Sequence, residues 1–201
     1  MAERSTEIHE ELQEAHEKSG NKWVAVYIAI LAVALAITGM GASNAMKDML
    51  SNNIEASNLW SFFQAKTIRK TGIDSAADQM GLILAANPAL PEAARKQIED
   101  TIKRYRAISA RYESEPDTKE GRKELIARAK EKEKARDTAQ RKDPYFDFAE
   151  ALIQIAIVLA SVSLITRTSL LLIVSFAMSG LGIFLSANGF LLFVKLGFLE
   201  H

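Results

Sequence analysis

Three long runs of apolar residues dominate the pattern along the chain. The first, Trp23–Ala42, contains 20 residues and no charged side chain. At a rise of about 1.5 Å per residue, a helix of this length spans roughly 30 Å, which matches one hydrocarbon core. A cleaved signal peptide is the alternative, but its apolar core is shorter and follows a positively charged segment. Residues 1–22 instead carry six acids and three bases, which favours a retained transmembrane helix behind an acidic N-terminal segment.

The other two apolar runs lie close together near the C-terminus. Residues 149–166 are charged only at Glu150, and residues 169–194 form 26 positions without a charge. Soluble core helices seldom run this long without charges. Only Arg167 and its neighbours separate the two runs, so we expect an antiparallel transmembrane hairpin that turns there, followed by a tail of residues 195–201.

The segment between the membrane runs, residues 43–148, has an interrupted helical pattern. Apolar side chains recur at three- and four-residue steps after the first run, so the first helix is expected to continue beyond the bilayer. Residues 87–91 predict a break, because proline disfavours helix at the preceding residue, and Pro91 is well placed to start the next helix. Asp143 and Pro144 are interpreted as the cap and first position of the second membrane helix.

A second helical stretch carries a short coiled-coil seam. Its positions recur at steps of 4, 3, 4 and 3 residues, namely Ile98, Ile102, Tyr105, Ser109 and Tyr112. Residues 115–117 interrupt it, and residues 119–142 are either a charged helix or a solvated linker. The simplest architecture is an all-α membrane protein with three transmembrane helices, whose long extramembrane helical arms fold back as a coiled-coil-like hairpin.

Small residues form stripes in the membrane runs. In the third run they recur at steps of 4, 3, 4 and 3, namely Ser175, Ser179, Gly182, Ser186 and Gly189. The second run has Ala156 and Ala160 on one face, and the first has Ala25, Ala29, Ala32 and Ala36. Small residues let helices approach closely where lipid supplies no hydrophobic drive. We therefore expect these positions to make helix-packing or oligomer contacts, and three helices per chain favour a homo-oligomer.

Three polar residues lie inside the predicted hairpin. With the turn at Arg167, Gln154 lies at the level of Leu181, and Glu150, Gln154 and Asn188 are all expected towards the membrane face that carries the middle segment. Polar groups in a bilayer usually turn inward to find partners. They indicate either an ion-interacting vestibule or, the reading we favour, interfacial anchoring and hydrogen bonds between helices.

Composition limits the chemistry. The chain has 25 basic and 25 acidic residues and no cysteine, which excludes disulfides and thiol catalysis. His9 and His16 are seven residues apart without a third ligand, and His201 is terminal. No glycine-rich phosphate loop or catalytic triad signature is present. We expect no enzyme activity, no cofactor, no metal and no nucleic-acid partner.

Two stretches make the chain resemble a known family. They are EASNLWSFFQAKTIRKT at Glu55–Thr71, and FAEALIQIAIVLASVSLIT at Phe148–Thr166 together with the SANGF end of the third run at Ser186–Phe190. The chain is similar to the bacterial family called domain of unknown function 4337 over nearly its whole length. The resemblance implies an uncharacterised bacterial membrane protein and no assigned activity. Trp60 and Phe63 in this block are expected in the core of the arms, and the alternative is an exposed docking patch of aromatic and basic residues. Tyr105 and Tyr112, along the other arm, are likewise candidates for arm core or docking.

These patterns predict a non-catalytic, oligomeric structural or adaptor protein that acts through its helical arms. The alternative is a channel-like or transport assembly with a pore lined by small and polar residues. The middle-segment side has eight basic residues near the membrane ends and the opposite side has four. By the positive-inside rule, we expect a multi-pass protein of the bacterial inner membrane with its middle segment in the cytoplasm.

Overall fold

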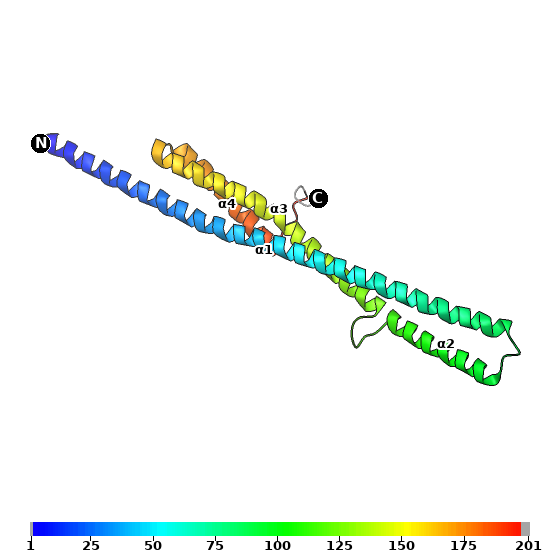
Figure 1. Cartoon of the computed structure of the whole chain (residues 1–201). Helices are drawn as coiled ribbons and strands as arrows, with labels where there is room; N and C mark the ends of the chain where they lie inside the picture. Colours follow the sequence, from blue (N-terminus) through cyan, green and yellow to red (C-terminus); the bar gives the residue numbers. More distant parts are fainter. Residues whose placement is uncertain (1, 198–201) are drawn as a thin grey trace. The chain divides into compact units, whose positions relative to one another are not determined.

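The chain folds almost entirely into helices. The computed structural model describes the backbone of residues 2–197 and the side chains of residues 22–197. Its elements are α1 (Ala2–Ala86), α2 (Glu92–Glu113), α3 (Arg122–Thr166) and α4 (Ser169–Leu191) (Figure 1). No strand occurs among residues 2–197. Within this part, α1, α3 and α4 are each long and apolar enough to cross a membrane, which confirms the predicted all-α class.

The chain divides into two compact units. The first, called here the apolar unit, consists of Met1–Asp48 and Thr138–His201, and the second, the charged unit, of Met49–Asp137. Each of α1 and α3 contributes residues to both units. Because the two units differ in what holds their helices together, they are described separately.

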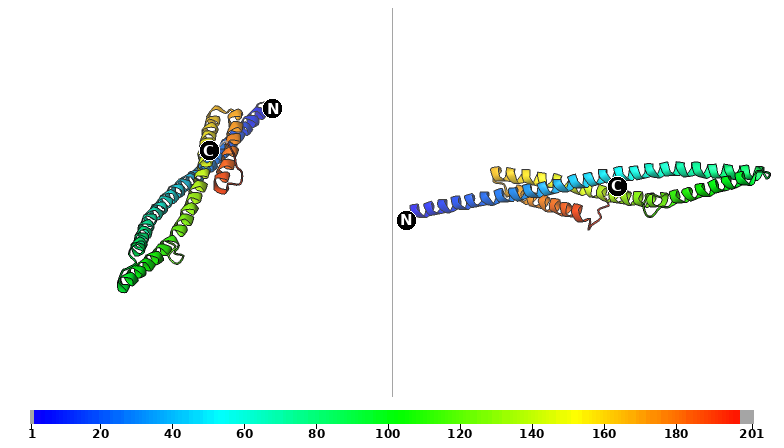
Figure 2. Two further views of the ribbon diagram at one scale, coloured as in Figure 1. Left: turned by 90° about the vertical axis from the view of Figure 1, so that its right-hand side faces the viewer. Right: turned by 60° about the horizontal axis from the view of Figure 1, so that its bottom comes forward.

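In the apolar unit, α3 and α4 lie side by side as the expected hairpin (Figures 1 and 2). Arg167 makes the turn with a φ of 56°, and the Ser163 hydroxyl donates to the Thr168 carbonyl at 2.9 Å. Two clusters of buried residues form the core: Tyr145, Ala149 and Leu185 in one, and Leu31, Ile153 and Ala156 in the other. The second cluster brings the membrane segment of α1 against the hairpin.

The expectation that Asp143 and Pro144 start the second membrane helix is wrong. α3 begins at Arg122 and contains Pro144, so the solvated-linker interpretation of residues 119–142 is also wrong from Arg122 onward. A proline inside a helix costs about 3 kcal/mol through a lost hydrogen bond and a clash with the preceding turn. Tyr145 and Phe146, which follow it, are 0% and 1% exposed. Tyr145 packs against Ala149 and Leu185, and Phe146 meets Phe190 edge to face with ring centres 4.9 Å apart. These contacts stabilise the helix directly after the proline.

The last helix ends earlier than the apolar run that predicts it. α4 stops at Leu191, whereas the run continues to residue 194, and Leu192 adopts a left-handed conformation with φ 51°. The Asn188 amide donates to the Val194 carbonyl at 2.8 Å and its oxygen accepts from the Val194 N–H at 2.9 Å. Asn188 therefore folds residues 192–194 back onto the helix end.

In the charged unit, α2 lies alongside the C-terminal part of α1, and the first part of α3 completes the unit (Figures 1 and 2). The break after Ala86 and the start of α2 directly after Pro91 agree with the sequence prediction. Helix α2 ends at Glu113, just before the interruption expected at residues 115–117. Lys119, in the connection to α3, has a φ of 56°.

Candidate functional site

A buried lysine forms the centre of the charged unit. Lys66 on α1 is 5% exposed. Its Nζ lies 3.7 Å from Glu115 Oε2 and 3.9 Å from Glu120 Oε2. The same nitrogen lies 5.4 Å from the centre of the Phe62 ring and 5.6 Å from that of Tyr112. Two carboxylates and two ring faces thus compensate the lost hydration of one charge.

Arg122, the first residue of α3, ties the same region together. Its guanidinium donates to Glu113 Oε2 at 2.6 Å and to the Thr67 hydroxyl at 3.0 Å. Its Cζ also lies 5.1 Å from the centre of the Phe63 ring. The start of α3, the end of α2 and the middle of α1 therefore meet at one junction.

The aromatic block around Trp60 belongs to this junction. Trp60 Nε1 donates to Glu133 at 2.8 Å, and its ring meets Phe63 edge to face with centres 5.6 Å apart. Both side chains are half-buried. Trp60 and Phe63 thus lie within the charged unit and contact α3. On α2, Tyr112 contacts Lys66, whereas Tyr105 is half-buried beside Arg104.

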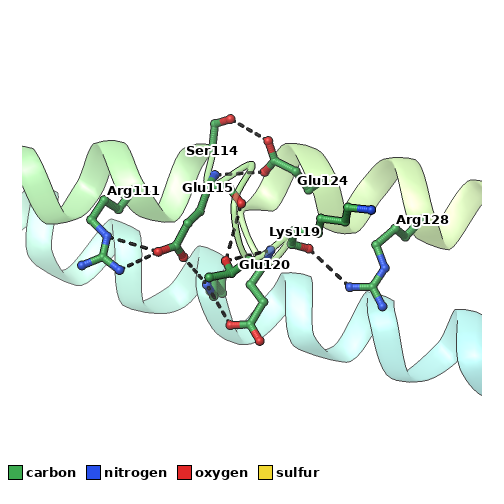
Figure 3. A network of polar contacts seen from close by, with 9 residues as sticks. Arg111, Ser114, Glu115, Lys119, Glu120, Glu124 and Arg128 are labelled. Carbon is green, nitrogen blue, oxygen red and sulfur yellow. Dashed lines mark hydrogen bonds and ion pairs between the residues drawn. The ribbon is translucent and has the colours of Figure 1, made fainter.

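The connection between α2 and α3 is closed by polar contacts (Figure 3). The Ser114 hydroxyl donates to Glu124 at 2.6 Å, and the Glu115 N–H donates to the same carboxylate at 3.2 Å. These hydrogen bonds hold the pKa of Glu124 below its usual range. Arg111 donates to Glu115 at 2.5 Å and lowers the pKa of that carboxyl. Arg128 reaches the Lys119 carbonyl at 3.3 Å, beside the left-handed turn.

A second group of charged side chains joins α1 and α2 closer to the C-terminal end of α1. Asp74 accepts from Lys70 at 2.9 Å and from Arg106 at 3.3 Å. Arg106 also pairs with Asp78. A hydrogen bond from Ser109, followed by that from Lys70, holds the pKa of Asp74 below its usual value. The coiled-coil seam predicted for α2 is thus partly a seam of charges.

The opposite face of α1 in this unit is uncharged and exposed. Its members recur at three- and four-residue steps, and every one of them is exposed. We call this the outer face: Leu50, Ile54, Ser57, Ser61, Gln64, Ile68, Gly72, Ser75, Gln79 and Leu82. The charged side chains of α1 lie on its other faces, and several of them pair with α2 or α3. A soluble helix normally shows the reverse arrangement, with apolar residues inward and charges outward.

In the apolar unit, hydroxyl groups pair between helices. The Tyr27 hydroxyl lies 3.0 Å from Ser175 Oγ and 2.9 Å from Ser179 Oγ, and Thr38 Oγ1 lies 2.8 Å from Ser186 Oγ. Ser175 also donates to the Ala156 carbonyl at 2.7 Å.

The small-residue stripe lies inside this unit. Ser175, Ser179, Gly182, Ser186 and Gly189 are all buried, as are Ala156 and Ala160 on α3. A Cβ added to Gly182 would lie 2.8 Å from Ile153 Cγ1, and one added to Gly189 would lie 2.8 Å from the Phe146 ring. Packing within the chain accounts for these close contacts without a second subunit. The alanines of α1 lie elsewhere, since Ala25, Ala29, Ala32 and Ala36 are all exposed.

The three polar residues predicted in the hairpin have different surroundings. Asn188 is buried at the end of α4, and Glu150 is half-buried, with its Oε1 3.0 Å from where a Cβ of Gly39 would lie. Gln154 is exposed. Among the described residues, Asn188 bonds to the backbone of Val194 and to neither of the other two side chains.

Comparison with known proteins places the whole arrangement in one family. The family model for domain of unknown function 4337 matches residues 20–192. The chain belongs to this family. The matched part of this member includes the Trp60 block, the Lys66 junction, the outer face and the small-residue stripe. Neither the curated proteins nor the solved structures contain a match to the chain.

Among the described residues, no group of three histidine, cysteine or acidic side chains is placed to hold a metal ion. The side chains of His9 and His16 and the whole of His201 lie outside the described residues. What the structure offers instead is a set of helices closed by internal contacts and one long uncharged face.

Proposed function

We propose that the protein is a non-catalytic, homo-oligomeric structural membrane protein that acts by contact through its charged unit. The observation that carries the proposal is the reversed polarity of α1, whose charges pair inward while an uncharged face is exposed. The function is thus sought in a surface and not in a pocket.

The outer face is long enough to be an interface. From Leu50 to Leu82 it extends over 32 residue steps, or about 48 Å of helix. Its apolar side chains are strongly exposed, with Ile68 at 73% and Leu82 at 70%. Covering such surface stabilises a complex by about 25 cal/mol for each Å² removed from water. Exposed apolar side chains rimmed by uncharged polar ones are a feature of interaction surfaces.

We take a second copy of the chain as the occupant. Ile54, Ser61, Ile68, Ser75 and Leu82 are seven residues apart and alternate between large and small. A seven-residue repeat is the spacing of helices that pair along a seam. Two copies of an uncharged face can pack together without charge repulsion. A partner with a charged surface would instead have its ions buried there without counter-ions.

Photoreactive crosslinking tests this assignment. Gln64 lies on the outer face and Gln97 is an exposed glutamine of α2, so the same photoreactive residue at either position is a matched pair. Crosslinked dimers from position 64 and none from position 97 would support the proposal. Crosslinks from position 64 to a different protein would make the chain an adaptor, and equal or absent crosslinking at both positions would overturn the proposal.

The proposal also includes location: the bacterial inner membrane, with the charged unit in the cytoplasm. Its support is the excess of basic residues near the membrane ends on that side. Because the chain has no cysteine, Asp117→Cys introduces a single thiol in the exposed connection between α2 and α3. We expect a membrane-impermeant thiol reagent to label it only after the cells are opened, and labelling in intact cells would place the charged unit outside.

A further inference from the structure

We propose that the chain pairs with a second copy inside the membrane through Gln154 on α3. This deepens the proposed function and rests on its oligomeric part. The relevant surface is the exposed side of α3 in the apolar unit, and it is separate from the outer face of α1.

The level of Gln154 in the bilayer follows from its neighbour. Helix α4 has 23 residues, about 34 Å, which is close to one hydrocarbon core. Gly182 lies near its midpoint, and a Cβ there would touch Ile153. Ile153, and with it Gln154, therefore lies near the middle of the apolar span. A glutamine side chain is too short to reach either interface from that depth.

Between residues 160 and 190 of the hairpin, each polar side chain apart from those at the Arg167 turn has a partner among the described residues. Ser161 and Ser163 donate to backbone carbonyls, and the same is true of Ser175, Ser179 and Asn188. Ser186 pairs with Thr38. Glu150, one turn before Gln154, is half-buried beside Gly39 of α1. Gln154 differs, because it is exposed and its amide has no hydrogen bond to the described residues. An exposed amide at this depth would face hydrocarbon, where it is costly without a partner.

A second Gln154 is the partner that fits best. A primary amide carries two N–H donors and a carbonyl acceptor, so two amides facing each other satisfy one another. A two-fold symmetric interface places a residue opposite its own copy near the axis. Around Gln154, Ala151, Ile155 and Val158 are exposed at the i−3, i+1 and i+4 positions and supply an apolar seam with one small residue for close approach.

Cysteine crosslinking locates the interface. Ala151 on the seam and Ala177 on α4 are both exposed alanines of the apolar span, and the natural chain has no cysteine. We expect oxidised membranes to yield disulfide-linked dimers from Ala151→Cys and not from Ala177→Cys. Equal yields from both, or disulfide-independent capture of position 151 by another protein, would overturn the pairing.

The strength of the pairing is measured by diluting labelled protein in lipid vesicles. Gln154→Leu should weaken dimerisation by roughly 10-fold, the effect of losing interhelical hydrogen bonds in a membrane. Ile155→Leu, on the same seam, should leave it unchanged, and both variants should keep the unfolding temperature of the monomer. An unchanged dimer in Gln154→Leu would overturn the role of Gln154 and leave the outer-face proposal standing, whereas a monomeric natural chain would overturn both.

Discussion

The two units solve the same problem, holding three helices together, with different polar groups. In the apolar unit the buried polar contacts are made by hydroxyls and an amide, as between Thr38 and Ser186. In the charged unit they are made by ions, as between Lys66 and Glu115. Moving an ion from water into hydrocarbon costs far more free energy than moving a hydroxyl group. Hydroxyl pairs therefore suit helices in lipid, and ion pairs suit helices in water.

The units also differ in how closely their helices approach. Among the helical glycines, those at positions 41, 182 and 189 of the apolar unit lie so close to their neighbours that an added Cβ would come within 2.8 Å of a side chain, whereas Gly72 and Gly81 of the charged unit have nothing within 4 Å of an added Cβ. Gly121, in the connection between α2 and α3, is also tightly enclosed. Without a hydrophobic drive between helices in lipid, close van der Waals packing takes a larger share of the stability. The comparison therefore predicts that steric changes act most strongly in one unit and charge changes in the other.

The largest effect is expected from a steric change at Gly182. Gly182→Leu puts a side chain where a Cβ alone would lie 2.8 Å from Ile153 and 3.2 Å from the Ala149 carbonyl. Overpacking of this kind typically costs about 1–3 kcal/mol, or more where backbone must move. Thermal unfolding in detergent should show it. Gly180→Leu is the matched control, because nothing lies within 4 Å of its added Cβ; equal losses in both variants would mean that close packing does not distinguish the two positions.

A charge change should act next most strongly, and in the charged unit. Lys66→Met leaves Glu115 and Glu120 without their buried cation and removes the contact with two rings. Because the carboxylates remain partly hydrated, we expect a cost of about 1 kcal/mol and not the larger penalty of a fully buried pair. Hydrogen exchange in the connection at residues 114–121 should accelerate. Lys96→Met, at an exposed lysine of α2, should leave that exchange unchanged.

The Lys66 junction also shows how far the sequence alone predicts the structure. The apolar runs predict the helices that contain them, and the break after Ala86 and the turn at Arg167 follow from local chemistry. The partners of Lys66 do not, because Glu115 and Glu120 lie about 50 residues away and become neighbours only when α2 folds back. From the sequence alone, a lysine within a helical segment is predicted to face solvent, because its partner cannot be identified.

Two further features depend on tertiary contacts in the same way. Pro144 reads as a helix start, and only the burial of Tyr145 and Phe146 shows why the helix continues through it. The small-residue stripe of α4 predicts close packing, but the sequence does not say whether the neighbour is α3 or another chain. The apolar pattern alone does not predict the outer face, although the seven-residue spacing from Ile54 to Leu82 points to it.

Acid should loosen the charged unit and leave the apolar unit unchanged. Asp74, Glu115 and Glu124 have folded pKa values below their ordinary ones, so each stabilises the charged unit above about pH 4 and loses that contribution as pH falls through the folded value. Spin labels at Gly72→Cys and Ala107→Cys, exposed positions on α1 and α2, should show a broader distance distribution below that pH.

A second label pair provides the comparison within the same experiment. Ala32→Cys and Ala177→Cys are exposed positions on α1 and α4 of the apolar unit. Their distance should not change over the same pH range, because the contacts between these helices are made by hydroxyl groups and apolar packing. Simultaneous broadening in both pairs would mean that the units do not differ in what holds them.

The smallest effect is expected from removing one hydroxyl pair of the apolar unit. Thr38 is 1% exposed, and its hydroxyl donates to the Ala34 carbonyl at 2.8 Å while lying 2.8 Å from Ser186 Oγ. Thr38→Val keeps the shape and removes the hydroxyl. Hydrogen bonds between membrane helices average about 0.6 kcal/mol, partly because a serine left alone can turn to the carbonyl four residues earlier. Thermal unfolding in detergent should therefore shift less for Thr38→Val than for Gly182→Leu. A shift as large as that of Gly182→Leu would show that hydroxyl pairing contributes as much to the stability of the apolar unit as close packing does.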